Sequence, residues 1–183
     1  MHDQIGYQAV LDFWFKEINS QQWWSKDSAL DRLITQRFLG AFNKAVRGEL
    51  FDWRVTPEGR LAEIIVLDQF SRNMFRDQPE SFAQDSLALV LAQEAIFNKA
   101  DKAIPTEWRS FMYMPYMHSE SLTIHQQAAT LFDQKGMEYN LDFELKHKVI
   151  IETFGRYPHR NKILKRESTP AELEFLKQPN SGF

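Results

Sequence analysis

Residues 61–76 read LAEIIVLDQFSRNMFR, and this stretch organises the rest of the chain. In a helix, Asp68, Arg72 and Arg76 stand at successive i, i+4 steps and share one face. Apolar residues precede them on that face, and no continuous polar stripe is left for solvent, which is typical of a buried helix. Because buried charges need partners, the stretch predicts that other helices bring polar groups to it.

The composition of the 183 residues favours a folded helical protein. Hydrophobic residues make up 43% of the chain and aromatic residues 14%, including 15 Phe and 5 Trp, which is enough for a large core. Gly and Pro, with 7 each, are too few for a turn-rich β protein. The chain has no cysteine, which excludes disulfides, thiolate metal sites and Cys nucleophiles. We expect a single domain over residues 1–183.

The N-terminal sequence, the lack of a long apolar run and the net charge predict a soluble cytoplasmic protein that does not bind nucleic acid. The N-terminus MHDQIGYQAVLDFWF has no basic region and is unlike a signal peptide, and no apolar run approaches the ~20 residues of a membrane span. The net charge of −3 gives no general attraction to nucleic acid. Residues 144–167 hold seven Lys or Arg against three Glu, an excess of +4. This basic region either attracts an acidic ligand or pairs with acids on the surface.

Apolar periodicity and helix caps predict an all-α chain of about eight or nine antiparallel helices. Asp27 and Thr56 are the expected N-caps of two of these helices. Thr169, Pro170 and Glu172 form a capping box with the preferred proline. No segment alternates strictly enough to require a strand, and no regular repeat is visible. The expected helices cover residues 5–18, 27–48, 56–76, 79–99, 106–114, 118–134, 140–154 and 169–176.

Trp23 and Trp24 stand side by side in the loop SQQWWSKD. Adjacent indoles could form a stacking surface for a ligand. The alternative is that the pair closes the core beneath the loop, and this reading is favoured because Trp buries a large apolar area.

Polar residues also stand at positions where the helical period calls for apolar ones. Asp85 shares the inward face of its predicted helix with Phe82 and Leu89. His147 likewise falls among the apolar residues of its own helix. We therefore expect both side chains to point inward, toward the charges of the central stretch.

Two short motifs add further polar groups. HSES places His118 and Glu120 at a predicted helix start, where unpaired backbone amides favour an acid. RYPHRN concentrates cationic, imidazole and amide groups within residues 156–161 and is stiffened by Pro158. The candidate ligand-binding residues are Asp68, Gln69, Arg72, Asn73, Arg76, Asp85, His118, Glu120, His147, Arg156, His159, Arg160 and Asn161.

Several chemistries could use these groups. An arginine-lined pocket would bind a carboxylate or phosphate through guanidinium forks. A hydrolase would use His118 with Glu120, or His147 with Asp85, as an acid–base constellation. Neither HExxH, nor a His pair at i, i+4, nor an EF-hand loop is present, so neither a metal nor a cofactor is expected. The alternative to all of these is a structural ion-pair network that orients the helices.

LDQFSRNMFR, FMYMPYMHSES and FGRYPHRNKILKRESTPAE, together with the N-terminal FWF and WW, resemble the bacterial domain-of-unknown-function family numbered nine-twenty-four. The resemblance covers nearly the whole chain. It implies an all-helical fold of the tetratricopeptide-like superfamily and implies no activity. Tetratricopeptide-like folds often present concave grooves to partners, which is an analogy at the level of the fold.

The hypothesis that follows is a binding protein whose Arg/His/Asp-lined pocket takes an acidic small molecule or a carboxylate-bearing peptide. A hydrolase and a tetratricopeptide-like protein-interaction scaffold with a purely structural polar cluster stay open as alternatives. Neither nucleic acid nor a membrane is an expected partner, whereas a protein partner stays open.

Overall fold

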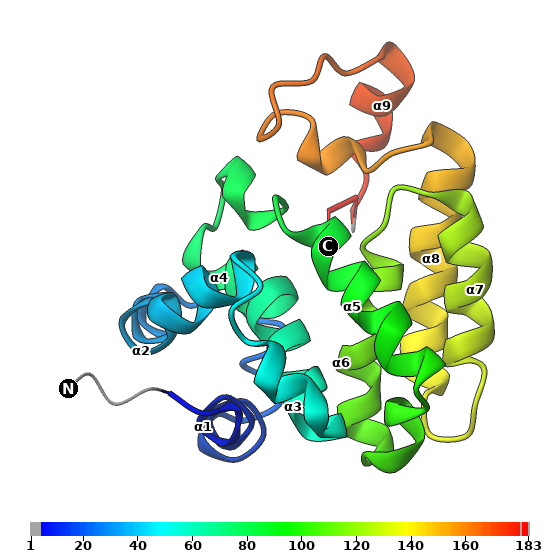
Figure 1. Cartoon of the computed structure of the whole chain (residues 1–183). Coiled ribbons are helices and arrows are strands. Elements are labelled where there is room, and N and C mark those ends of the chain that lie inside the picture. The colour runs from blue at the N-terminus through cyan, green and yellow to red at the C-terminus, as the bar shows by residue number, and fades with distance from the viewer. Residues whose placement is uncertain (1–4, 180, 183) are drawn as a thin grey trace.

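Helix follows helix from Tyr7 to Phe175 in the computed structural model of the chain, which describes residues 5–179 and 181–182 (Figure 1). No strand occurs in these residues, so the all-α prediction is confirmed. None of their helices combines the length and apolar character that a membrane span requires. A tetratricopeptide-like arrangement and a single domain stay predictions. The α-helices are α1 Tyr7–Asp12, α2 Ser28–Val46, α3 Pro57–Ile65, α4 Ser71–Met74, α5 Asp85–Phe97, α6 Thr106–Met117, α7 Leu122–Phe132, α8 Glu138–Phe154 and α9 Pro170–Phe175.

The central element is a continuous helical run from α3 to α4 whose pitch changes midway. Thr56 caps α3, as predicted, because its hydroxyl accepts a hydrogen bond from the backbone N–H of Gly59 at 3.0 Å. Between the two α-helices, Val66–Phe70 forms a π-helical turn. Every residue from Leu61 to Ser71 is buried, so the prediction of a buried central helix is confirmed.

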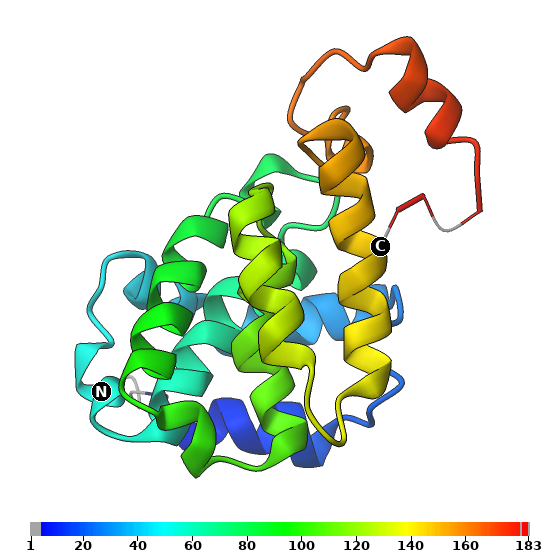
Figure 2. The ribbon, with the colours of Figure 1, turned by 90° about the vertical axis from the view of Figure 1, so that its right-hand side faces the viewer.

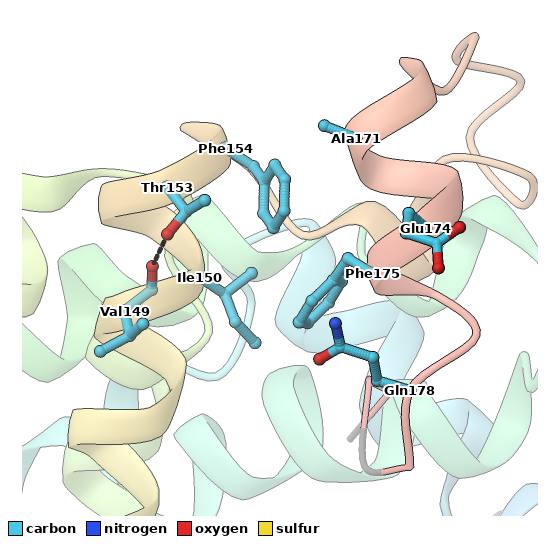
Figure 3. A pocket seen from close by; sticks show the side chains of 8 residues that line it. All are labelled: Val149, Ile150, Thr153, Phe154, Ala171, Glu174, Phe175 and Gln178. Atoms are coloured by element: carbon cyan, nitrogen blue, oxygen red, sulfur yellow. Dashed lines mark hydrogen bonds between the residues drawn. The ribbon is translucent and has the colours of Figure 1, made fainter.

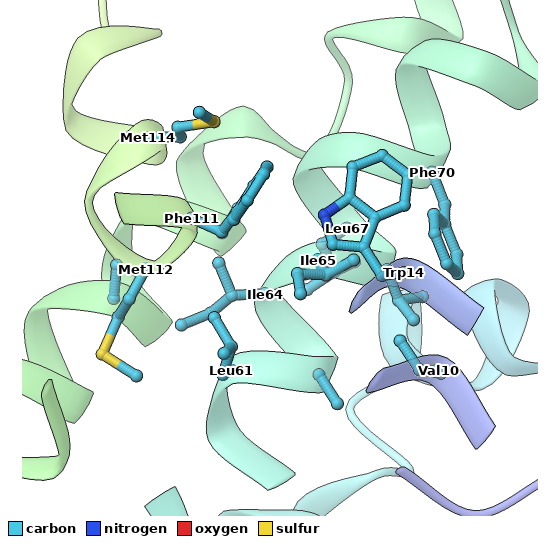
Figure 4. Packing of buried hydrophobic residues seen from close by; sticks show 14 of the residues in the cluster. Val10, Trp14, Leu61, Ile64, Ile65, Leu67, Phe70, Phe111, Met112 and Met114 are labelled. Atoms are coloured by element: carbon cyan, nitrogen blue, oxygen red, sulfur yellow. The ribbon is translucent and has the colours of Figure 1, made fainter. Parts of the chain in front are cut away.

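The core forms around this run (Figure 4). Helix α3 contacts α1, α5 and α6, while α2 contacts the π turn and α4. Trp14 lies between Phe70 of the run and Phe111 of α6, with its ring centroid 5.6 Å from each of theirs. Edge-to-face aromatic packing of this kind locks the N-terminal segment onto the central run.

Helices α5 to α8 stand side by side as a second group (Figure 2). The prediction that a helix ends before Pro115 is wrong, since α6 continues through Pro115 to Met117. Proline removes one backbone hydrogen bond, but the last eight residues of α6 are all buried, and their packing offsets that loss. The next helix starts at Leu122 rather than at His118, so the HSES motif lies mostly in the link between α6 and α7.

Helix α9 lies beyond the C-terminal end of α8 (Figure 1). Gly155, at φ +68°, ends α8 in the left-handed conformation that favours glycine. The predicted capping box at Thr169 and Glu172 is present. The rings of Phe154 and Phe175, with centroids 5.1 Å apart, pack α9 against α8.

Candidate functional site

The carboxylate of Asp68 is the fully buried centre of a polar junction. Its Oδ1 atom lies 2.7 Å from Nδ1 of His118 and 3.3 Å from Nη1 of Arg72. Its Oδ2 atom accepts a hydrogen bond from Gln69 at 2.6 Å. The π turn supplies Asp68 and Gln69, and π turns within α-helices are frequent at functional sites. His118, at the end of α6, contacts this carboxylate. This agrees with the prediction that another helix brings a polar group to the central stretch.

Asp85, at the first turn of α5, joins Arg72 of the central stretch to Arg160 of the RYPHRN motif. Nη2 of Arg72 donates to its Oδ2 atom at 3.0 Å, and Nη1 of Arg160 donates to the same oxygen at 3.2 Å. Arg160 also donates through Nη2 to the backbone oxygen of His118 at 3.0 Å. We call Asp68, Arg72, Asp85, His118 and Arg160 the junction site.

Aromatic rings enclose the guanidinium of Arg160. It lies 4.6 Å from the ring centroids of both Phe82 and Tyr157. Arg72 lies 5.6 Å from the ring of Phe82 on its own side. Cation–π contacts of this kind hold both arginines in place and limit their contact with water.

The electrostatics of the junction site fix the charge of Asp68 and His118. Burial opposes the ionised form of Asp68, but the contact with His118, the positive charge of Arg72 and the hydrogen bond from Gln69 lower its pKa below the usual range. Burial and the positive charge of Arg72 lower the pKa of His118, and they outweigh the attraction of Asp68. At neutral pH the site therefore holds an ionised Asp68 beside a neutral imidazole.

A second cluster lies between the α6–α7 link and the C-terminal turn. Glu120 accepts hydrogen bonds from Arg166 at 2.7 and 2.9 Å and from the backbone N–H of Tyr157 at 2.8 Å. Glu172 of α9 accepts from Arg156 at 2.6 and 2.8 Å, and Asn161 donates to it at 3.3 Å. Glu120, Arg156 and Asn161 thus brace the C-terminal segment instead of entering the junction site.

Asn73 and Arg76 lie at a third place. Both side chains bond to Asp31 of α2, with Asn73 at 2.8 Å and Arg76 at 2.6 and 2.7 Å. The prediction that Arg76 shares the face of Asp68 is wrong, because α4 ends at Met74 and the helical register does not reach Arg76. These two residues join the central run to α2.

His147 and His159 lie against Tyr157, whose ring also contacts Arg160 of the junction site. The ring centroids of His147 and His159 are 5.7 and 5.5 Å from that of Tyr157. Nδ1 of His147 lies 2.7 Å from the backbone oxygen of Phe143 and donates to it. Burial lowers the pKa of His147 to about 3 and that of His159 to about 4, so both rings are neutral at pH 7.

The acid–base pairs of the hydrolase alternative are arranged differently from the prediction. The carboxylate at the His118 ring belongs to Asp68, and Glu120 bonds to Arg166. Asp85 bonds to the arginines. Among the described residues, no group of three or more His, Asp or Glu side chains is placed to hold a metal ion.

Sequence reasoning missed several acceptors and donors that complete these clusters. Asp31, Arg166 and Glu172 were absent from the candidate set although each pairs with a candidate. Glu144 was also missed, and it lies fully buried with Oε1 2.7 Å from Nδ1 of His125. The available signal was a charge among apolar residues of a helix, which Glu144 shows only weakly because Asp142, Lys146 and Lys148 make the whole segment strongly charged.

Two surface hollows lie away from the junction site. One of about 500 Å³ separates the end of α8 from α9 and is lined by Ile150, Phe154 and Phe175 among others (Figure 3). The other, of about 480 Å³, lies where the Trp loop meets α6 and the start of α8. Its aromatic lining residues are Trp23, Trp24, Phe111 and Tyr139.

The tryptophan pair divides between the two roles considered for it. Trp23 donates from its indole nitrogen to the backbone oxygen of Trp14 at 2.9 Å and packs against the core. Trp24 is 58% exposed and stacks parallel to Phe111 across 6.1 Å. The core-closing prediction therefore holds for Trp23 and is wrong for Trp24. The two residues are adjacent in the loop, and only the side chain of Trp23 packs against the core.

With this geometry in hand, the family model described as "Bacterial protein of unknown function (DUF924)" matches residues 10–180. The chain belongs to this family. The DUF924 chain is also similar to a solved structure, that of protein of unknown function ATU0120 from Agrobacterium tumefaciens. The TM-score is 0.89 at 39% sequence identity, covering 93% of this chain and 96% of the other. No curated protein matches the chain.

Proposed function

We propose that the junction site binds a small molecule that carries a carboxylate, with Arg72 and Arg160 as its cationic donors. The observation that carries this proposal is the convergence of two guanidinium groups on the single carboxylate of Asp85. The convergence lies at the protein edge, since the side chains of Arg72 and Asp85 keep 22% and 16% of their exposure. Paired guanidinium groups fixed in this way match the planar geometry of a carboxylate.

The junction site retains hydrogen-bonding capacity that the described residues do not use. The buried Nε atom of Arg160 finds no acceptor among them, and the buried Nδ1 atom of neighbouring His159 finds no partner there either. Buried polar atoms of folded proteins are almost always hydrogen-bonded to protein, water or a ligand. These unpaired atoms leave hydrogen-bonding capacity in the site for a water molecule or a ligand.

Charge balance defines what kind of binding the site supports. The two carboxylates of Asp68 and Asp85 offset the two guanidinium charges, so the net field is weak. Directional hydrogen bonds therefore supply the recognition, while Asp85 keeps both arginines in position before the ligand arrives. The same ion pairs also brace the helices, and a structural role and a binding role are compatible here.

The test is the thermal shift of the protein with a panel of small carboxylates. Arg72→Lys keeps the positive charge but removes the guanidinium fork. Arg47→Lys is the matched control, because Arg47 pairs with Glu49 on an exposed surface just after the end of α2. We expect a carboxylate to raise the melting temperature of the native protein and of the Arg47 variant, with a reduced shift in the Arg72 variant. Absence of any shift, or equal shifts in all three proteins, would contradict the proposal.

A second candidate function is recognition of an apolar group at the aromatic hollow. Trp24 and Tyr139, which line it, are 58% and 67% exposed, and exposed aromatic clusters mark interaction surfaces. A tetratricopeptide-like scaffold would use such a surface to hold a partner. Trp24→Ala should abolish partner or ligand capture, while Val55→Ala, at a residue that is 84% exposed elsewhere, should preserve it. Equal capture by both variants would remove this candidate.

A further inference from the structure

We infer that the ligand of the junction site carries a hydroxyl close to its carboxylate, so that the site takes short hydroxycarboxylates. This inference rests on the proposed function and adds the group that would bind His118.

The contact with Asp68 decides the tautomer of His118. Nδ1 lies 2.7 Å from a carboxylate oxygen that is buried and ionised, so Nδ1 must carry the hydrogen that it donates. The imidazole is neutral at pH 7, because burial and Arg72 lower its pKa. Nε2 therefore holds a lone pair and can only accept a hydrogen bond.

The second nitrogen of His118 is open to a ligand. The His118 side chain is 16% exposed. Nε2 bonds to none of the described residues and is not enclosed by them. Nε2 therefore faces solvent, where a donor from outside the protein can reach it. The Asp68 contact holds the ring in one orientation while it waits for that donor.

The imidazole stands close to both guanidinium groups. Oδ1 of Asp68 contacts Nδ1 of His118 at 2.7 Å and Nη1 of Arg72 at 3.3 Å, so one oxygen atom joins the two side chains. Arg160 donates to the backbone oxygen of His118 at 3.0 Å. A carboxylate bound by the arginines and a donor bound by Nε2 can thus belong to one short molecule.

The environment of His118 favours a hydroxyl over an ammonium as that donor. The burial and the Arg72 charge that disfavour an imidazolium at this place also disfavour a ligand cation against Nε2. A hydroxyl donates a hydrogen bond without bringing a positive charge. A hydroxy acid therefore fits the site better than an amino acid of the same length.

The experiment compares matched ligands by isothermal titration calorimetry at pH 7.5. Glycolate is compared with acetate, malate with succinate, and lactate with both propionate and alanine. We expect each hydroxy acid to bind about tenfold more tightly than its partner without the hydroxyl, which is the usual effect of one hydrogen bond. In His118→Gln this ratio should fall toward one, while weak binding of the plain carboxylates should persist.

A second measurement protects the test against a His118 variant that fails to fold. In the native protein the ratio of hydroxy acid to plain acid affinity should fall at acidic pH, where Nε2 gains a proton and can no longer accept a hydrogen bond. Equal affinities within each matched pair would overturn the inference while leaving the proposed function standing. Failure of every carboxylate to bind would overturn both, and tighter binding of alanine than lactate would replace the hydroxyl by an amine.

Discussion

Protonation of His147 and His159 should destabilise the fold between pH 8 and pH 5. The pKa of these rings falls from 6.5 to about 3 and about 4 in the folded protein because burial disfavours the imidazolium. A histidine with a depressed folded pKa contributes stability above its unfolded pKa, and that stability is lost as the pH falls toward the folded value. At pH 5 the unfolded chain has bound a proton at each position and the folded chain has not. The expected loss is about 2 kcal/mol for each histidine.

Chemical denaturation followed by tryptophan fluorescence at pH 8 and pH 5 measures this loss. His147→Gln and His159→Gln should each reduce the difference between the two pH values by about 2 kcal/mol, whatever their effect at pH 8. The comparison within each variant separates the titration from the change in packing. Equal stability of the native protein at both pH values, or a full loss in both variants, would refute the reasoning.

Two other predictions concern packing and paired charge. Gly59→Ala should destabilise the protein by about 3 kcal/mol or more, because the added Cβ would lie 2.0 Å from the backbone oxygen of Trp53. Gly40→Ala, in α2, should stabilise it by about 1 kcal/mol, because nothing lies within 4 Å of the added Cβ. Shifts of the denaturation midpoint in the same direction for both variants would contradict this. Asp85→Ala should cost about 3–5 kcal/mol because it leaves the buried Arg160 facing Arg72 without their shared carboxylate. Added formate should restore part of that stability, and a melting temperature insensitive to both the substitution and formate would disprove the role of Asp85.

Local signals predicted the starts of helices well. Asp27, Thr56 and Thr169 each cap the helix predicted after them, because a cap depends on a side chain and the backbone two or three residues later. Such contacts are contained within the sequence itself. The apolar period likewise identified the buried face of the central run before any partner was known.

Signals that depend on distant contacts were less reliable. Pro115 lies inside α6 although proline normally ends a helix, because its surroundings are fully packed and the lost hydrogen bond is offset there. The end of α4 at Met74 could not be read from an unbroken i, i+4 pattern that continues to Arg76. In both places tertiary structure overrides the local preference of the sequence.

The candidate site was predicted as a set of residues and not as a set of pairs. Asp68, Arg72, Asp85, His118 and Arg160 were all in that set, since each stands out as a polar group in an apolar or stiffened segment. Which acid meets which base depends on helix packing, and the chain offers several acids at similar sequence distances. Glu120 and Asp68 are an example, because His118 is close to the first in sequence and bonds to the second.

The π turn at Val66–Phe70 accommodates about one additional residue within the central run. Before the turn, the apolar contacts of α3 fix the rotation of the helix about its axis. After the turn, the hydrogen bonds that Arg72 and Asn73 make to different helices fix it. In an α-helix each residue is rotated by about 100° around the axis relative to the residue before it. A π turn, whose hydrogen bonds run from i to i+5, uses about one residue more than an α turn for nearly the same rotation. Deleting one residue within it would therefore restore regular pitch and leave Arg72 and Asn73 facing Asp85 and Asp31. Removal of one residue should therefore be tolerated within these five residues, whereas insertion of another would rotate Arg72 and Asn73 by about 100° away from their partners.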